Sequence, residues 1–347
     1  MGATIKDIAE RTGLGLATIS KYLNGGHVLD KNRIAIEQAI KELDFTVNEF
    51  ARGLKTNQSK MVGAIIPQLN NIFMTSIITI IEEKLRAAGY GVLVCDTGKN
   101  EEWEREAFQF LIQKKVDGII LLTSSTQGEG VEAAIQCGIP TVLIDRKIDR
   151  LSDKLDMVLV DNFSGSYGCI EYFIQKGHRK IGILLGDTKL YTPKIRLEGY
   201  KAALAKHNLP IQKKWIAETD FSLRQGYEAM RQMLEQKERV TAVLATNGDM
   251  TLGAVLAIRD CGLSIPEDIS VIGFDNEQLA KVHSPQLTMV VQPLEDIGQR
   301  AAERILERMN QKETIACSRT DIFPVKLMER GSVGNPPSDN CYKKHIK

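Results

Sequence analysis

The segment TIKDIAERTGLGLATISKYLNGG (residues 4–26) decides the fold of the first part of the chain. Thr4 and Asp7 have the spacing of a capping box, and Gly13 is placed to end the helix that they begin. After the turn GLG, a second short helix runs to Leu23. It carries Ala, Thr, Ser and Lys where a surface helix usually carries Glu and Lys. Many short helices carry hydroxyls by chance, so the neighbouring segments decide its interpretation.

The next residues predict a third helix, because apolar side chains between Ile34 and Leu43 form one stripe. Three short helices with a tight turn between the first two match the helix-turn-helix plan. The segment NEFARGLKT (residues 48–56) has a further helical pattern that is too short and polar to be stable alone.

From Met61 the pattern changes to apolar runs that alternate with amphipathic helices. Continuous apolar, β-branched runs indicate parallel strands that are covered on both faces. The series restarts near residue 162, so we expect two doubly wound α/β lobes, with a ligand cleft at the carboxyl ends of the strands. The runs are MVGAIIP, GVLVCDT, DGIILLT, TVLID, MVLVD, KIGILLGD, TAVLATN, ISVIGFD and LTMVVQ.

The predicted domains follow these changes of pattern. A helix-turn-helix domain spans residues 1–46, and a hinge and linker span residues 47–60. A two-lobed core of residues 61–332 has lobes of about 61–161 and 162–290, with crossover strands near 287–293 and 320–328. Residues 333–347 have no apolar periodicity and are expected to form a disordered tail.

Composition bounds the function. The chain has 347 residues, with 45 Lys and Arg against 44 Asp and Glu, so its net charge of +1 argues neither for nor against a polyanionic partner. The six cysteines lie far apart and indicate a reducing compartment. Because neither a signal peptide nor a membrane-spanning run is visible, we expect a cytoplasmic, nucleoid-associated protein without membrane contact.

Several motifs together resemble the lactose-repressor (LacI/GalR-type) family of bacterial transcription regulators. They are TIKDIAERTGLGLATISKYLNGG, NEFARGL, GHRKIGILLG, RLEGY, IPEDISVIGFDN and SPQLTMVVQPLEDIG, in the family's order from about residue 3 to residue 332. The resemblance implies a dimeric repressor that reads a palindromic operator in double-stranded DNA and has a two-lobed, periplasmic-binding-protein-like core. It also implies a small effector, a sugar or sugar acid, bound between the lobes. Because a C-terminal leucine heptad is missing, we expect a homodimer.

Physical reasoning assigns contacts to the second helix, whose first residues enter the major groove in this motif. Leu16 and Ala17 would touch thymine methyl groups, and Lys21 would reach a guanine or a phosphate. Hydroxyl and amide groups near this helix would contact phosphates and position it: Thr4, Thr18, Ser20 and Asn24. Gly15 stands where the family usually has a Ser cap.

The segment 48–56 resembles the family's hinge helix, which folds on the operator. Leu54 matches the leucine wedge that opens the minor groove, and Ala51 matches the small residue beside it. Asn48 and Lys55 would contact the DNA backbone. The alternative is an ordinary linker.

The expected effector pocket collects polar groups that end apolar strands, with two aromatic faces for stacking on a sugar. These residues are Phe73, Asp145, Arg196, Phe221, Asn247, Asp275 and Gln292. For any single one of them, a structural role in capping a loop is nearly as favoured, but for Arg196 and Asp275 we favour contact with the ligand. Gly248 separates Asn247 from Asp249, so we expect Asn247 to keep its role while Asp249 points elsewhere.

Other function classes remain as alternatives. A sugar-acting enzyme on the same scaffold is disfavoured, because no nucleophile elbow, phosphate loop or clustered His or Cys is present. We therefore expect no catalytic residue, metal or cofactor. A periplasmic binding protein is disfavoured by the N-terminal helices, whereas regulation by a protein corepressor stays open.

Overall fold

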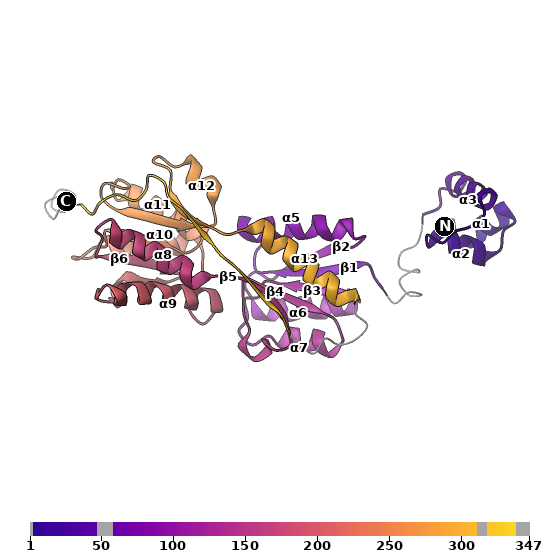
Figure 1. The fold of residues 1–347 in the computed structure, drawn as a ribbon, viewed down its shortest axis with the longest axis horizontal. Coiled ribbons are helices and arrows are strands. Elements are labelled where there is room, and N and C mark those ends of the chain that lie inside the picture. Colours follow the sequence, from indigo (N-terminus) through magenta and orange to yellow (C-terminus); the bar gives the residue numbers. More distant parts are fainter. Residues whose placement is uncertain (1–2, 47–57, 311–317, 338–347) are drawn as a thin grey trace. The chain divides into compact units, whose positions relative to one another are not determined.

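The computed structural model describes residues 3–46, 58–310 and 318–337, and the chain divides into two units, Met1–Ser59 and Lys60–Lys347 (Figure 1). Each unit has buried cores of its own. Across the described ranges, no helix combines the length and the apolar character that crossing a lipid bilayer requires.

The first unit folds as three helices. They are α1 (Ile5–Thr12), α2 (Leu16–Leu23) and α3 (Asp30–Glu42). The backbone N–H of Thr4 donates to Asp7 Oδ2 at 2.6 Å, which confirms the capping box. Gly13 ends α1 with a φ of 69°, a conformation that costs glycine little, and its N–H donates to the carbonyl of Ala9.

A small apolar core holds the three helices together. Ile8 of α1, Ile19 of α2 and Ile36 of α3 are fully buried against one another. Burying an isoleucine side chain stabilises a fold by about 1.5–3 kcal/mol, so this core carries much of the unit's stability. The packing leaves the opposite side of α2 exposed.

The first lobe of the second unit is a six-stranded sheet in the order β11-β5-β4-β3-β1-β2, with every pair parallel. Its strands are β1 (Met61–Ile66), β2 (Gly91–Asp96), β3 (Gly118–Leu121), β4 (Thr141–Ile144), β5 (Asp156–Val160) and β11 (Thr320–Phe323). Its helices are α5 (Ile72–Ala87), α6 (Glu101–Gln113), α7 (Glu129–Gln136), α13 (Leu294–Asn310) and the short η1 (Asp149–Leu151).

Alternate strand residues bury both faces of this sheet. Ala64 and Ile66 of β1 pack with α5 and α13, whereas Ile65 packs with α6 and α7. Side chains alternate across a strand, so a strand that is covered twice reads as a continuous apolar run. This covering explains the run that identified β1 in the sequence.

The second lobe repeats the plan with the order β12-β10-β9-β8-β6-β7, in which only β12 runs antiparallel to its neighbour among the described pairs. Its strands are β6 (Ile181–Leu185), β7 (Ile216–Glu218), β8 (Ala242–Ala245), β9 (Ser270–Phe274), β10 (Thr288–Val291) and β12 (Lys326–Met328). Its helices are α8 (Asn162–Gln175), α9 (Tyr191–Lys206), η2 (Lys213–Trp215), α10 (Leu223–Leu234), α11 (Gly248–Asp260) and α12 (Glu277–Val282). The predicted pair of doubly wound lobes is confirmed.

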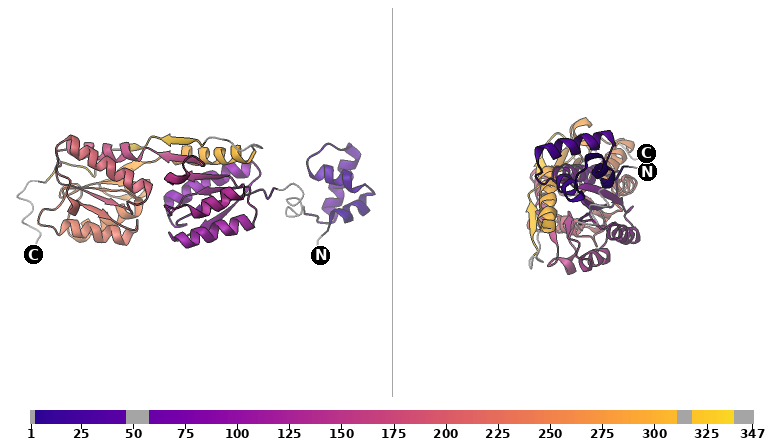
Figure 2. Two further views of the ribbon diagram at one scale, coloured as in Figure 1. Left: turned by 90° about the horizontal axis from the view of Figure 1, so that it is seen from below. Right: turned by 90° about the vertical axis from the view of Figure 1, so that its right-hand side faces the viewer.

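The chain passes between the lobes after β5, after β10 and after β11. After β10 it returns to the first lobe as α13, and β12 then rejoins the second lobe. This C-terminal segment runs along one side of both lobes (Figure 2). Such crossings allow the angle between lobes to change while the lobes stay packed.

The predicted tail begins too early. Val333 is 8% exposed and packs in the second lobe's core. His178 Nε2 lies 3.1 Å from the carbonyl oxygen of Gly334, whose N–H donates to Ser270 Oγ. The prediction of disorder is therefore wrong for Val333 and Gly334, because backbone hydrogen bonds fix a segment that lacks apolar periodicity.

Candidate functional site

Helix α2 exposes the residues predicted to read DNA. Leu16 is 47% exposed, Ala17 and Lys21 are also exposed, and Ile19 on the opposite side is buried. Gly15 caps the helix without a side-chain hydrogen bond. An apolar pair at the start of an exposed helix is the arrangement that can meet base edges in a groove.

The residues predicted to contact phosphates also have local partners. The Thr4 hydroxyl donates to Asp7 Oδ2 at 2.8 Å, and the Asn24 amide donates to the carbonyl of Ser20 at 2.7 Å. These bonds cap α1 and close the end of α2. Thr18 and Ser20 are partly exposed. Asn48, Ala51, Leu54 and Lys55, assigned to the hinge, lie outside the described residues.

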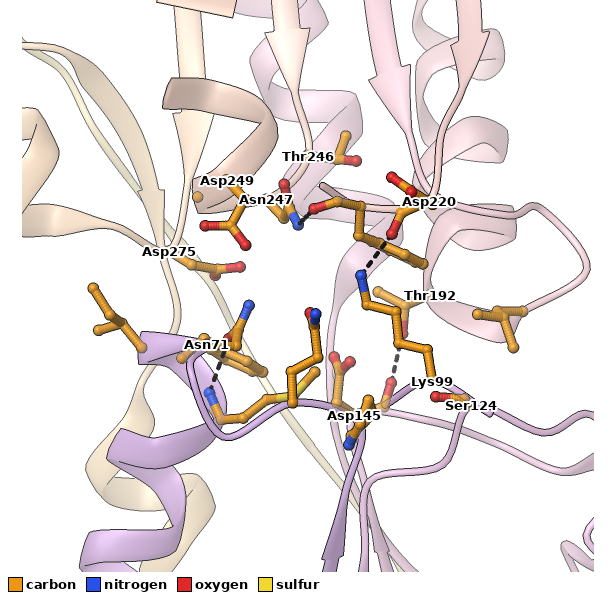
Figure 3. Close-up of a pocket in the computed structure, with 18 of the residues that line it drawn as sticks. Asn71, Lys99, Ser124, Asp145, Thr192, Asp220, Thr246, Asn247, Asp249 and Asp275 are labelled. Atoms are coloured by element: carbon orange, nitrogen blue, oxygen red, sulfur yellow. Dashed lines mark hydrogen bonds between the residues drawn. The ribbon is translucent and has the colours of Figure 1, made fainter. Parts of the chain in front are cut away.

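All seven residues predicted for the effector pocket line one cavity of about 290 Å³ between the lobes. This main pocket lies at the carboxyl ends of strands of both sheets (Figure 3). Its volume is near the lower end of the range for small-molecule sites. The sequence therefore identified residues that the fold brings together, and their binding role stays a prediction.

Backbone conformation directs three of these side chains into the main pocket. Asp145, Phe221 and Asp275 have φ values of 62°, 65° and 68°, in the left-handed region that residues other than glycine seldom adopt. Each such residue costs about 1–3 kcal/mol, and strain of this kind collects at ligand sites. We infer that these positions are held for the shape of the pocket.

Arg196 is 4% exposed and spans the floor of the main pocket. Its Nε donates to Asn162 Oδ1 at 2.8 Å, and its Nη1 donates to the carbonyl of Thr246. The guanidinium also lies 3.9 Å from the ring centroid of Phe274. Burial lowers the pKa of Arg196, and Asp275 opposes this effect. The guanidinium is thus fixed in place with donors left for a ligand.

Asp275 and Gln292 form a pair, because the Gln292 amide donates to Asp275 Oδ1 at 2.6 Å. Burial raises the pKa of Asp275 to about 6, while the charge of Arg196 and the bond from Gln292 lower it and Asp145 raises it further. A carboxyl group whose pKa is close to neutral pH can accept hydrogen bonds when ionised and donate one when protonated.

This pKa predicts a pH-dependent stability. Between about pH 4 and pH 6, Asp275 binds more protons in the folded than in the unfolded chain, so its contribution to the free energy of unfolding falls as pH rises. The side chain of Asp275→Asn stays neutral at every pH. Above pH 6 the free energy of unfolding of this variant is expected to exceed that of the wild type by about 3 kcal/mol, and the difference is expected to disappear toward pH 4. Urea unfolding across this range measures the difference. A difference that does not change with pH contradicts the prediction.

Asn247 has the structural role that the sequence left open. Its Oδ1 accepts from the N–H of Met250 at 2.7 Å, which caps α11, and its amide donates to the carbonyl of Phe221 at 3.0 Å. Asp249, in the first turn of α11, lines the main pocket (Figure 3). The expectation that Asp249 points elsewhere is wrong, because Gly248 opens the helix and the acid follows in its first turn.

Sequence reasoning missed residues that join the lobes at the main pocket. Lys99 Nζ of the first lobe donates to the carbonyl of Asp220 of the second lobe at 2.7 Å. Thr192 Oγ1 of the second lobe donates to the carbonyl of Asp145 of the first lobe at 2.5 Å. Both residues lie in loops or at a helix start, where no periodicity marks them. A polar residue soon after a strand, as Lys99 is after β2, was the available signal.

Three buried polar atoms in the main pocket have no hydrogen-bond partner among the described residues. They are Asp145 Oδ1, Arg146 Nη1 and Gln292 Oε1. An unsatisfied buried polar group costs about 1–3 kcal/mol, so a ligand that forms hydrogen bonds with these atoms would be stabilised by them. Two of them are acceptors and one is a donor.

Carboxylates outnumber cations on the wall of the main pocket. The acids are Asp145, Asp187, Asp220, Asp249 and Asp275, and the cations are Lys99, Arg146 and Arg196. This balance disfavours a ligand with a strong negative charge at this place. No group of His, Cys, Asp and Glu side chains in the described ranges is arranged to hold a metal ion.

Comparisons with known proteins agree with this architecture. Residues 4–48 match the family model of bacterial regulatory proteins of the lacI family, and residues 170–333 match the periplasmic binding protein-like domain. The HTH-type transcriptional repressor PurR of Proteus mirabilis (strain HI4320) is 34% identical over 342 residues, which cover 96% of this chain and 98% of that protein.

Solved structures extend the likeness. The Lac repressor dimer bound to operator and the anti-inducer ONPF has a TM-score of 0.85 and 26% identity, covering 96% of this chain and all of that one. The complex of the transcriptional regulator CelR with cellobiose has a TM-score of 0.73 and 26% identity, covering 95% and 99%.

Proposed function

The chain belongs to the lacI family of bacterial regulatory proteins, and we propose that a neutral, polyhydroxylated effector in the main pocket controls its affinity for operator DNA. It is a DNA-binding transcriptional repressor of this family. The observation that carries the proposal is the set of unpartnered buried atoms, two acceptors and one donor. Neighbouring hydroxyl groups both donate and accept, so a sugar can satisfy all three.

The charges of the side chains that line the main pocket narrow the proposed class of effector. Five carboxylates against three cations favour a neutral sugar over a sugar acid, whose own carboxylate would be repelled. The structural relative CelR binds cellobiose, which is neutral. The predicted pocket residues, from Phe73 to Gln292, keep their proposed ligand-contacting roles, with Asn247 acting through the α11 cap.

The DNA side of the proposal is a homodimer in the cytoplasm that reads a palindromic operator. A single short helix reads few base pairs, whereas a two-fold pair reads two half-sites. The likeness to the Lac repressor dimer supports this assembly. We propose that α2 enters the major groove, and that effector binding acts on DNA affinity by changing the angle between the lobes.

The test starts with selection of bound DNA from a random pool. Operator affinity is then measured at fixed salt with neutral sugars and with the matching sugar acids. A ten-fold shift by a neutral sugar, which equals about 1.4 kcal/mol of coupling, supports the proposal. A shift by sugar acids alone contradicts the effector class. A palindrome whose affinity no small molecule changes points to a protein corepressor.

The hinge gives a separate prediction, which rests on the family resemblance of residues 48–56. Leu54→Ala is expected to weaken specific operator binding about ten-fold, because an apolar wedge contributes to the kinked complex. Binding to random DNA should stay unchanged, since that binding depends on phosphate neutralisation. Titrations with operator DNA and with random DNA measure the ratio of the two affinities. Lys55→Ala is the matched control and should weaken both; equal losses with Leu54→Ala contradict the wedge role.

A further inference from the structure

A second cavity, of about 400 Å³, adjoins the main pocket and has no role in the proposal above. The first lobe contributes the segments that follow β3 and β4, and the second lobe contributes the start of α9. We call it the lateral cavity. Its two walls therefore belong to the two lobes.

Positive charge dominates the lateral cavity. The first lobe contributes Arg146, Lys147 and Arg150, and the second lobe contributes Lys189 and Lys194. Asp149 is the single acid among the described residues that line it, and it pairs with Lys147 at 3.2 Å. Arg150 pairs with Glu132. Cations of both lobes thus line one cavity at the junction of the lobes.

In the part of the chain that the structure describes, no ion pair joins Lys189 or Lys194 to a carboxylate. Both side chains are exposed and follow β6 or open α9. Most other cations near the lobe junction are paired or bonded, such as Lys99 and Arg150. These two lysines can therefore turn to a shared ligand without breaking an ion pair.

Arg146 offers a donor to an anion in the lateral cavity, because its Nη1 carries two N–H groups and a sugar hydroxyl in the main pocket would use one of them. It is 7% exposed, and its Nη1 is buried without a hydrogen-bond partner among the described residues. Its one carboxylate neighbour is Asp145, with Nε and Oδ2 3.4 Å apart. A buried guanidinium with an unused donor is costly, so an acceptor that completes it would stabilise the site. Arg146 lines both the lateral cavity and the main pocket.

We propose that the lateral cavity binds a phosphate dianion, held by Arg146 of the first lobe and by Lys189 and Lys194 of the second. Phosphate offers several acceptor oxygens, and a guanidinium and two ammonium groups match them. Cations on facing lobes repel one another, and a dianion between them replaces repulsion with attraction. Binding there favours closer approach of the lobes on this side and reaches the main pocket through Arg146.

The phosphate can come from two sources. One is free inorganic phosphate that binds beside a neutral effector. The other is the phosphate group of a phosphorylated sugar whose ring occupies the main pocket, since the two cavities share Arg146 and Leu190. The second source rests on the proposed sugar site in the main pocket but replaces the neutral effector by a phosphorylated one, whereas the first does not depend on the effector.

The first experiment measures binding of radiolabelled inorganic phosphate to the full chain by equilibrium dialysis at constant ionic strength. The test variant is Lys189→Gln with Lys194→Gln. The control is Lys201→Gln with Lys237→Gln, which removes the same charge at exposed positions that do not line the cavity. We expect saturable binding that weakens about ten-fold or more in the test variant alone, as for losing charge-assisted hydrogen bonds.

The second experiment compares ribose with ribose 5-phosphate, and glucose with glucose 6-phosphate, in the same three proteins. If phosphate and a neutral sugar bind at the same time, the ligand of the lateral cavity is free inorganic phosphate. A sugar phosphate that binds more tightly than its sugar, displaces phosphate and loses this gain in the test variant identifies a phosphorylated effector. The proposal is overturned if the affinities for phosphate and for the sugar phosphates are the same in the test variant as in the wild type. This result would not affect the proposed response to neutral sugars.

Discussion

Arg196→Ala is expected to abolish the effect of the effector on operator affinity and to lower the free energy of unfolding by about 3–5 kcal/mol. The substitution leaves Asn162 Oδ1 and the carbonyl of Thr246 buried without their donor. It also removes the cation that faces Asp275. The main pocket then loses its fixed guanidinium, and it also loses the positive charge that favours the ionised form of Asp275.

The two effects of Arg196→Ala must be separated, because a destabilised pocket can also fail to bind. Asn162→Ala serves as the control, since Asn162 is buried beside Arg196 but does not line the main pocket. We expect this control to lose about 1–3 kcal/mol of stability while it responds to the effector within a few-fold of the wild-type concentration. Urea unfolding gives the stability of each variant, and operator titrations below the unfolding transition give its response to the effector. A normal response by Arg196→Ala contradicts its place in the binding site.

The sequence predicted most strands because both sheets are covered on both faces. Each buried strand is then a continuous apolar run, as in β1 and β9, and the polar residue that ends it marks the pocket. Asp145 and Asp275 follow strands in this way. The strand β7 was not predicted, because its three residues lie at the edge of the sheet, where Ile216 and Ala217 are half-buried and Glu218 is exposed.

The pocket residues that escaped prediction depend on how the lobes meet. Lys99 reaches Asp220, which lies 121 residues away in the sequence, and no local pattern encodes that distance. Arg146 is buried although its residue type is usually exposed. Asp249 was misassigned because the first turn of α11 starts at Gly248. Contacts between lobes are set by tertiary packing, which periodicity along one element does not report.

Bonds between the lobes explain how a small ligand can have a large effect. The lobes touch at the main pocket through Lys99 with Asp220 and through Thr192 with Asp145. Each bond contributes about 0.5–1.5 kcal/mol, so the balance between lobe angles is close. A ligand that bonds to both walls adds a comparable energy to one angle. The coupling therefore needs no chemical step.

Ala17→Glu is expected to weaken operator binding about 100-fold or more without a change in stability. Ala17 is exposed at the start of α2, so the unit's core of Ile8, Ile19 and Ile36 stays intact. If this helix end enters the major groove, a carboxylate there lies near phosphates and replaces a methyl contact. The substitution is expected to weaken binding by about 1–3 kcal/mol at each half-site, and a dimer carries it twice.

A matched control separates helix placement from net charge. Lys41→Gln on α3 changes the charge by the same single unit at an exposed position outside the predicted reading helix. It should weaken specific and random DNA binding by similar, smaller factors, because it acts through the general field alone. Fluorescence anisotropy at fixed salt measures both variants against both DNAs. Equal losses for the two variants would show that the start of α2 does not lie in the groove.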